Sequence, residues 1–381
     1  MTTAVSESAE AIGERVREAA GRGARLRIVG AGTWLDAGRP VDSSEQLSLA
    51  AHAGIVEYTP GDLTLTARGG TTLREIHDAV AAHGQWLALD PFGSDDGTIG
   101  ATVATASAGP LATRFGTPRD LVLGLEFVSG RGTAARGGGR VVKNVAGFDL
   151  TRLLTGSWGT LGAITEVTVR LHARPESDAT LAVPVADSRA GIGQIRATLK
   201  QWPFVPFACE VLTDTIGRTI GLEGASVLFR LGGNSEAVSA QRRAVATLGD
   251  AREVDPQVWR ALRSAEAGGS IVMRFSRAPA DVQAAWSDAL ALTAPYAAAW
   301  MSGSPTRGIV RCVIPGTGAS AQRLASALAE IGSRVVVERA PADLWKALPL
   351  SRGGADPLQS RVRDAFDQQR ILNRGILGAG A

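Results

Sequence analysis

The chain has 381 residues, of which 45% are hydrophobic and 20% charged, and its formal net charge is +3. This length is typical of two domains, and the composition is that of an ordinary globular protein. No apolar run approaches the roughly 18 residues that cross a bilayer, and the first residues lack the basic and apolar regions of a signal peptide. We therefore expect no transmembrane segment and a cytoplasmic location.

The cysteine, histidine and arginine content argues against iron–sulfur, metal and nucleic-acid sites in this chain. Only Cys209 and Cys312 are present, too few to ligate an iron–sulfur cluster, so any such cluster has to lie in a partner. The four histidines show no metal-ligand spacing, so no metal site is expected. The arginines are scattered, and the Gly/Arg-rich stretch 131–140 lacks the interleaved aromatic residues of a nucleic-acid-binding segment. It is more typical of a solvated hairpin, and nucleic acid is not an expected partner.

Short strands and glycine turns dominate the first half of the chain. Ile12, Val16, Ala19 and Ala20 lie at helical spacing and predict an N-terminal helix that ends at Gly21. The further elements expected, in chain order, are strands at 25–29, 55–58 and 63–67, a helix over 72–83, strands at 121–129 and near 140–142, a short helix at 150–154 and a β-rich run from 164.

From about residue 178 the pattern changes, because strands now alternate with amphipathic helices. Strands are expected at 180–185, 225–231, 270–275, 308–314 and 334–339, with helices between them that end near 199, 248, 293 and 331. This alternation predicts a separate α+β or α/β domain whose helices cover one face of a sheet. The boundary is expected near 173–175, and a last helix at 358–366 precedes the C-terminal residues.

Three turns are rich in glycine and hydroxyl residues, at 30–33, 97–109 and 156–162. Glycine lets backbone N–H groups approach a ligand closely, and nearby hydroxyls add further donors. A Rossmann dinucleotide site does not explain the first turn, because the third glycine of that fingerprint is replaced by Leu35 and a turn-like segment follows. A P-loop is also absent from the sequence.

Together the three turns resemble the FAD-binding domain of the vanillyl-alcohol oxidase / p-cresol methylhydroxylase family. The loop that holds the pyrophosphate in that family is matched by Gly30, Ala31, Gly32 and Thr33. The second element, G-T-x-G-G-x-x-A, is matched by Gly97, Thr98, Ile99, Gly100, Ala101 and Ala104. The third, G-Y-D-L followed by G-S-x-G-x-L-G-x-I-T, is matched by Gly147, Phe148, Asp149, Leu150, Gly156, Ser157, Gly159, Leu161, Gly162, Ile164 and Thr165.

The end of the chain extends the resemblance. Residues 366–367 and 371–375 are similar to the family's F-D-P-x-x-I-L-N-P-G ending, with Gln368 and Arg374 in place of both prolines. The resemblance implies an α+β fold, in which a two-part FAD-binding domain of this type carries a smaller α/β cap domain. Residues 1–175 would form the FAD-binding domain, 176–345 an α+β cap for substrate or partner, and 346–381 a segment that returns to the FAD domain.

The resemblance also implies site chemistry. Lys143 and Asn144 could supply a donor or positive charge near N1/C2=O of the flavin, whereas no catalytic base can be named. Family members that oxidise D-2-hydroxy acids use histidines and an acid to bind a metal, but residues 176–345 contain no histidine. The histidine that tethers flavin in the first loop of some members is also missing from residues 1–51, so FAD is expected to bind noncovalently.

Within the family, residues 107–110 and 142–153 look most like the FAD-binding subunits of bacterial glycolate oxidases. This likeness implies a subunit of a glycolate oxidase (dehydrogenase) complex that converts glycolate, a small 2-hydroxy acid, to glyoxylate. Its implied partners are a larger catalytic flavoprotein and an iron–sulfur subunit, through which it could associate with a membrane. The alternatives are a self-sufficient FAD-dependent oxidase of another alcohol or hydroxy acid, and a non-catalytic flavin-binding scaffold.

Overall fold

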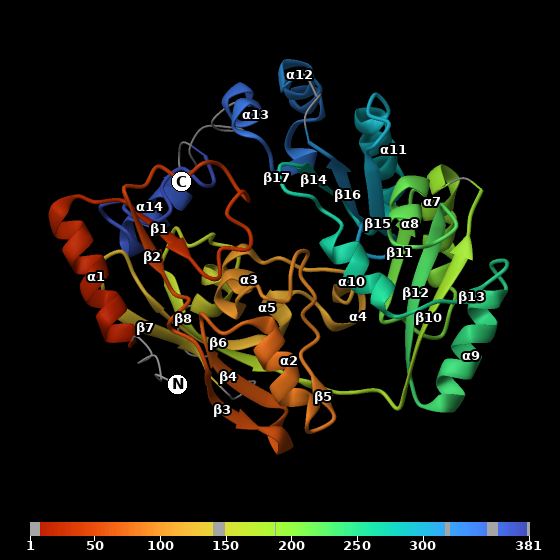
Figure 1. The fold of residues 1–381 in the computed structure, drawn as a ribbon, viewed down its shortest axis with the longest axis horizontal. Helices are drawn as coiled ribbons and strands as arrows, with labels where there is room; N and C mark the ends of the chain where they lie inside the picture. The colour runs from red at the N-terminus through yellow and green to blue at the C-terminus, as the bar shows by residue number, and fades with distance from the viewer. Residues whose placement is uncertain (1–7, 140–148, 187, 317–320, 349–356, 379–381) are drawn as a thin grey trace.

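The protein contains two large antiparallel sheets, one in each half of the chain. The computed structural model describes residues 8–139, 149–186, 188–316, 321–348 and 357–378. The first half of the chain forms a five-stranded sheet in the order β3-β4-β8-β6-β7, and the second half forms an eight-stranded sheet in the order β13-β10-β12-β11-β15-β16-β14-β17. Figure 1 shows the two sheets on opposite sides of the molecule, with the C-terminal segment back beside the first.

The first half combines the five-stranded sheet with a small parallel pair of strands, β1 and β2. Its strands are β1 (Leu26–Val29), β2 (Glu45–Ser48), β3 (Ile55–Thr59), β4 (Thr64–Arg68), β5 (Gln85–Trp86), β6 (Val122–Val128), β7 (Ala134–Gly138), β8 (Ala163–Arg170) and β9 (His172–Ala173). Its helices are α1 (Ala9–Arg22), α2 (Leu73–Ala81), α3 (Ile99–Thr105), α4 (Ala112–Phe115), α5 (Pro118–Leu121) and α6 (Leu150–Leu154), with a 3₁₀ turn at Pro60–Asp62.

Local sequence explains where these elements start and stop. Helix α2 begins at a capping box in which the Thr72 hydroxyl accepts from the Glu75 N–H while the Glu75 carboxylate accepts from the Thr72 N–H. Helix α1 buries Ile12, Val16 and Ala19, as its spacing predicts, but its predicted end at Gly21 is wrong. The helix continues to Arg22, because the residue that adopts the left-handed conformation of a helix end is Gly23, with φ 66°. The strand expected near 140–142 lies outside the described residues.

The eight-stranded sheet consists of two similar halves. Each half follows the order β-α-β-β-α-β of a ferredoxin-like unit, and the halves join where β11 pairs with β15. The first half contains β10 (Ser177–Pro184), α7 (Ser188–Leu199), β11 (Ala208–Leu212), α8 (Asp214–Thr219), β12 (Ser226–Gly233), α9 (Ser235–Ala246) and β13 (Arg252–Glu253). After α10 (Gln257–Ser264), the second contains β14 (Ile271–Ser276), a 3₁₀ turn (Pro279–Asp281), α11 (Val282–Thr293), β15 (Trp300–Ser304), β16 (Ile309–Ile314), α12 (Ala321–Ile331), a 3₁₀ turn (Gly332–Arg334) and β17 (Val335–Arg339).

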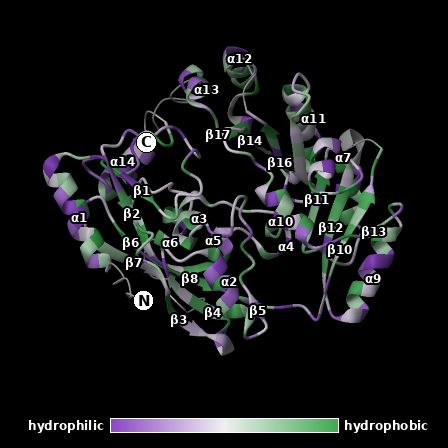
Figure 2. Cartoon of the chain, viewed as in Figure 1, coloured by the Kyte–Doolittle hydropathy of each residue, from purple (hydrophilic) through white to green (hydrophobic). Residues whose placement is uncertain are grey.

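The two faces of this sheet have different roles. One face packs against α7, α9, α11 and α12 in the largest core of the protein, where Phe229, Phe275 and Trp286 are fully buried. All strand pairings in this sheet are antiparallel. The second half of the chain, for which the sequence left both α+β and α/β open, is therefore α+β. In Figure 2 the strands are mostly hydrophobic, whereas helices such as α1 and α9 also carry hydrophilic residues. On the other face, α8 and α10 pack against part of the sheet in a second apolar cluster, and another part faces the first half of the chain.

The C-terminal segment returns to the first strand. After α13 (Ala342–Ala347) and α14 (Pro357–Phe366), the chain runs beside β1, where the Leu26 N–H donates to the Ile371 carbonyl at 2.7 Å. The fully buried Asp367 carboxylate accepts from the N–H groups of Ile371 (3.1 Å) and Leu372 (2.9 Å) and so fixes this turn. Among the described residues, no helix combines the length and apolarity that crossing a membrane requires.

Candidate functional site

A cleft opens in the first half of the chain between the β1–β2 pair, helix α3 and the turn after α6. It encloses about 1080 Å³ of free space, its open mouth included, a size suited to a small-molecule or cofactor ligand. Of the sequence-predicted site residues, the structure places these along its walls: Gly30, Ala31, Gly32, Thr33, Gly97, Thr98, Gly100, Ala101, Gly159, Gly162 and Ile164.

The loop after β1 supplies unpaired donors to this cleft. Within the described residues, the backbone N–H groups of Ala31, Gly32 and Thr33 donate to no protein acceptor. The indole Nε1 of Trp34, which also lines the cleft, is buried and has no hydrogen-bond partner among the residues that the structure describes. Gly32 has φ 73°, a conformation that favours glycine. Three successive free amides form the kind of concave donor group that binds a phosphate oxygen.

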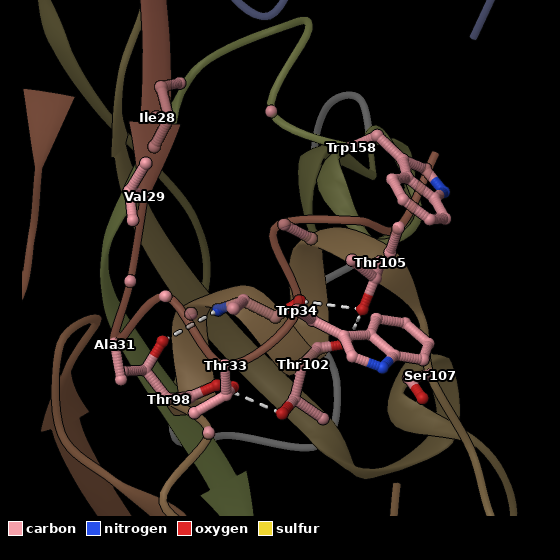
Figure 3. A pocket seen from close by; sticks show the side chains of 18 of the residues that line it. Ile28, Val29, Ala31, Thr33, Trp34, Thr98, Thr102, Thr105, Ser107 and Trp158 are labelled. Atoms are coloured by element: carbon pink, nitrogen blue, oxygen red, sulfur yellow. Dashed lines mark hydrogen bonds between the residues drawn. The ribbon is translucent and has the colours of Figure 1, made fainter. Parts of the chain in front are cut away.

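Helix α3 forms the floor of the cleft, and the backbone N–H groups at its start already donate to acceptors within the protein. The N–H groups of Ile99 and Gly100 donate to the Thr71 and Gly69 carbonyls, both at 2.9 Å, and that of Ala101 donates to the Thr98 hydroxyl at 3.3 Å. A Cβ on Gly100 would lie 2.7 Å from the Gly69 carbonyl oxygen, so glycine here allows close backbone packing. Helix α3 therefore lines the cleft with its surface and with side-chain hydroxyls (Figure 3), and these N–H groups are not free to bind a ligand.

The turn after α6 contributes only part of its predicted residues. Gly156, Ser157 and Leu161 do not line the cleft. Leu161 is buried in the core, and the Ser157 hydroxyl is enclosed with no hydrogen-bond partner in the described part of the chain. The Thr160 hydroxyl donates back to the Ser157 carbonyl at 2.7 Å. Trp158, with φ 54°, lines the cleft instead. Lys143 and Asn144 lie outside the described residues.

Asn373 completes the cleft, although it is not among the site residues predicted from the sequence. Its carboxamide oxygen accepts from the Ile28 N–H and its nitrogen donates to the Trp158 carbonyl, both at 2.7 Å. The side chain thus joins β1 to the turn after α6. The sequence feature that could have pointed to Asn373 is its position in the I-L-N ending. The contacts of this ending become visible only in the fold.

A second cavity adjoins the cleft and lies between the two halves of the chain. It has about 1000 Å³ of free space, its mouth included, and shares Trp34, Phe92, Thr105, Ser107 and Trp158 with the cleft. Its other wall is the polar face of the eight-stranded sheet, which presents Glu210, Arg274, Ser302, Ser304, Arg311 and Glu338, together with Arg307 from the β15–β16 turn.

The patterns in the sequence did not predict this polar wall. Side chains alternate between the two faces of a strand, so Glu210 in β11 and Arg311 in β16 face the cavity while their apolar neighbours enter the core. A charged residue in the middle of an otherwise apolar strand was the available signal. Burial raises the pKa of the Glu210 carboxyl to about 8, against the opposing influence of Arg307, and such a shift beside a cleft marks a candidate functional group.

Histidine and cysteine take no part in these walls. His52 lies against the Thr165 carbonyl, with its Nε2 at 2.9 Å, and Cys209 and Cys312 are both buried. In the part of the chain that the structure describes, no three His, Cys, Asp or Glu residues are grouped so as to hold a metal ion.

The chain is similar in sequence to known FAD-binding proteins. Residues 3–138 match the family model of an FAD binding domain. The chain is 33% identical over 256 residues to glycolate oxidase subunit GlcE of Escherichia coli, an alignment that covers 67% of this chain and 68% of GlcE. It is 38% identical over 160 residues to glycolate oxidase subunit GlcD of Bacillus subtilis, covering 41% of this chain and 34% of GlcD.

The fold has a solved relative. Alkyldihydroxyacetonephosphate synthase superposes with a TM-score of 0.67 at 16% sequence identity, covering 97% of this chain and 76% of the synthase. At this identity the likeness concerns the fold alone.

Proposed function

Because the chain belongs to the FAD-binding oxidoreductase family of the glycolate oxidase subunits, we propose that it is the FAD-binding subunit of a glycolate oxidase complex. The family and α+β fold class predicted from the three turns are confirmed. FAD is the cofactor. The observation that carries the proposal is the alignment with GlcE over two thirds of both chains, combined with a cleft walled by the family's glycine turns.

The cleft fits FAD through its free donors. The amides of Ala31, Gly32 and Thr33 would hold the pyrophosphate, and Trp34 Nε1 offers a further donor. Gly97, Thr98, Gly100 and Ala101 would form the surface beneath it, with Gly159, Gly162 and Ile164 opposite. When bound, FAD supplies the redox chemistry, and the protein supplies its orientation and surroundings. In this proposal residues 1–175 and 346–381 bind FAD, and 176–345 form the cap.

The complex would contain two further subunits, a catalytic flavoprotein and an iron–sulfur protein. GlcE and GlcD are both named as glycolate oxidase subunits, which supports an assembly of several chains. The two cysteines of this sequence are fewer than the four thiolates that usually hold an iron–sulfur cluster, which supports placing the cluster in a partner. Glycolate would be oxidised to glyoxylate by the assembled complex.

Anaerobic reduction of the purified FAD-loaded chain tests the proposal. Glycolate or D-lactate should leave the flavin absorbance unchanged, whereas dithionite should bleach it. Coexpression with the two partners should restore glycolate-dependent reduction of an acceptor dye. A complex built with the Gly32→Val chain, which fills the cleft, should show lower acceptor reduction. An equal rate with and without FAD in this subunit would favour a non-catalytic scaffold.

A self-sufficient oxidase is the second candidate, and one observation favours it. The cavity beside the cleft carries the buried Glu210 carboxyl and the Arg307 guanidinium, groups that could exchange a proton and bind an acid. Rapid bleaching of the isolated chain by a 2-hydroxy acid would establish this function and overturn the subunit proposal.

A further inference from the structure

Two tryptophans, Trp34 and Trp158, stand where the cleft adjoins the second cavity. Both side chains line the cleft and both line the cavity, so their rings belong to the wall that the two spaces share. In Figure 3 both indoles project to the same side of the cleft as Thr105 and Ser107, which also line both spaces. Each tryptophan is half-buried, so part of a broad aromatic surface is left open for another flat ring to pack on.

Trp158 holds its place at the expense of backbone strain. Its φ is 54°, in the left-handed region that bulky residues rarely adopt, whereas the neighbouring Gly156 and Gly159 adopt similar angles without a Cβ. The Trp158 N–H donates to the Ala104 carbonyl at 2.8 Å, and Asn373 Nδ2 donates to the Trp158 carbonyl at 2.7 Å. These bonds impose the conformation. Strain that is over-determined in this way is characteristic of functional sites.

Trp34 has an unfavourable feature in its side chain. Its Nε1 is buried and has no hydrogen-bond partner within the described residues, and an added Cβ on Gly93 would lie 3.8 Å from this nitrogen. A buried donor without an acceptor costs free energy that a phenylalanine ring would avoid. Trp34 also directly follows the free amides of residues 31–33. Two large rings are therefore kept at one end of the cleft although each lowers the stability of the empty protein.

We propose that Trp34 and Trp158 are positioning residues for the isoalloxazine ring of FAD, with their indoles packed against it. The proposal rests on the part of the proposed function that puts the pyrophosphate at residues 31–33. Of the two arms that leave the pyrophosphate, only the flavin arm has to exchange electrons with another molecule. That arm belongs at the end of the cleft that adjoins a second space, and the tryptophan pair lies there.

The two parts of the cleft should then recognise different parts of the cofactor. The amides of residues 31–33 act on the pyrophosphate, which ADP also contains. The tryptophans act on the flavin ring, which ADP lacks. Variants of the tryptophans should therefore weaken FAD and leave ADP unaffected, whereas Gly32→Val should weaken both, because it fills the part of the cleft that both ligands need.

Titration of FAD and of ADP into the cofactor-free full chain tests this division. Trp158→Gly removes the ring and the backbone strain together, so the chain should stay folded, bind FAD about tenfold more weakly and bind ADP normally. Trp34→Ala should behave in the same way, and Trp34→Phe should recover most of the FAD affinity because it restores an aromatic ring. Trp202→Phe, whose indole stacks on Phe204 in the second half of the chain, is the control and should bind both ligands as the wild type does.

Flavin fluorescence provides a second readout, because an indole in contact with a flavin ring quenches its emission. FAD bound to the wild type should be dimmer than free FAD. Trp158→Gly and Trp34→Phe should each brighten the bound flavin, and the double variant should brighten it further. The Trp202→Phe chain should stay as dim as the wild type.

Two results would overturn the proposal. One is normal FAD affinity with unchanged emission in folded Trp158→Gly and Trp34→Ala chains. The other is an equal loss of ADP and FAD affinity in these variants, which would put the adenine beside the tryptophans. Neither measurement uses turnover or a partner subunit, so the proposal can fail while glycolate oxidation by the complex succeeds, and the reverse.

Discussion

Asn373 shows how a single side chain can hold a cofactor cleft together. Its amide is an acceptor for the Ile28 N–H and a donor to the Trp158 carbonyl, and its own N–H donates to the Leu26 carbonyl at 2.9 Å. The residue is 5% exposed and has φ 41°, a backbone conformation that asparagine tolerates better than most residues. Shape, hydrogen bonding and backbone preference all favour asparagine here.

Asn373→Leu should therefore weaken both the fold and FAD binding. The change leaves the Ile28 N–H and the Trp158 carbonyl without partners, which should lower the free energy of unfolding by about 2–4 kcal/mol. Urea unfolding followed by far-UV circular dichroism and FAD titration measure the two effects. Asn234→Ala, at the exposed N-cap of α9, should cost about 1 kcal/mol and leave FAD affinity unchanged. Equal FAD affinity in a folded Asn373→Leu chain would contradict this role.

Gly32→Val should abolish FAD binding while the fold survives. A Cβ at Gly32 meets no atom closer than 3.7 Å, so the side chain would enter the open cleft, and φ 73° adds backbone strain. Gly159→Val should also lose FAD, for a different reason, because its Cβ would lie 2.6 Å from Asn373 Nδ2. Gly191→Ala in α7, where no atom lies within 4 Å of the added Cβ, is the control. Fluorescence titration with FAD measures all three, and normal affinity in Gly32→Val would remove the first loop from the site.

At the scale of elements, the strands β14, β16 and β17 depend on a buried row of charges. Glu338 is enclosed and its burial alone would raise its pKa, but Arg311 and Arg274 outweigh this effect and hold the pKa below the ordinary value. A depressed folded-state pKa means that the ionised group stabilises the fold above the ordinary glutamate pKa. That contribution disappears as pH falls through the folded-state value.

Glu338→Gln should destabilise the protein by about 3–5 kcal/mol, because it leaves Arg274 and Arg311 opposed without their shared carboxylate. The wild type should lose stability on acidification below about pH 5, and the variant should show a shallower loss, since this titration is removed. Urea unfolding at a series of pH values measures both. Glu223→Gln, in a surface pair with Arg252 that leaves Glu223 76% exposed, should change little. Parallel pH profiles for wild type and Glu338→Gln would refute the account.

The sequence predicted elements well where periodicity was strong. Helices α2, α9 and α11 and strands β8, β12 and β16 were expected from their apolar spacing. Strands β11 and β15 were missed, because both are five residues long and buried on both faces, and the Ser and Gly residues of β15 are more typical of turns. The cavity was missed with them, since it depends on a pairing between β11 and β15 that only the folded sheet creates.

At the scale of the whole molecule, arginines from the second half of the chain bind residues of the first half around the cleft. Arg263 of α10 donates to the Pro91 carbonyl at 2.9 Å and to Asp95 at 3.1 Å, which fixes the loop beside Phe92. Arg339 of β17 pairs with Asp36, just after the loop with the free amides. The second half of the chain therefore supports the cleft from outside even where it does not line it.

FAD should be released intact from this assembly by acid. The sequence has no histidine before His52, and His52 itself is buried against Thr165 and is not among the residues that line the cleft. We expect trichloroacetic acid to precipitate a colourless protein and leave a yellow supernatant with the absorption of free FAD. Colour that stays with the pellet after washing would show a covalent bond and contradict this prediction.

The bond between Ile28 and Asn373 joins residues that are 345 positions apart. Contacts of such long sequence separation form late, because the entropy of closing the intervening loop is lost before they stabilise anything. Flavin uptake should therefore report the completion of folding, since the cleft gains its last wall only after the C-terminal segment has docked beside β1. A ligand that binds only the finished fold adds its own binding energy to stability. Cells short of flavin would then accumulate this chain in a looser, protease-sensitive form, with the terminal strand pairing as its weakest point.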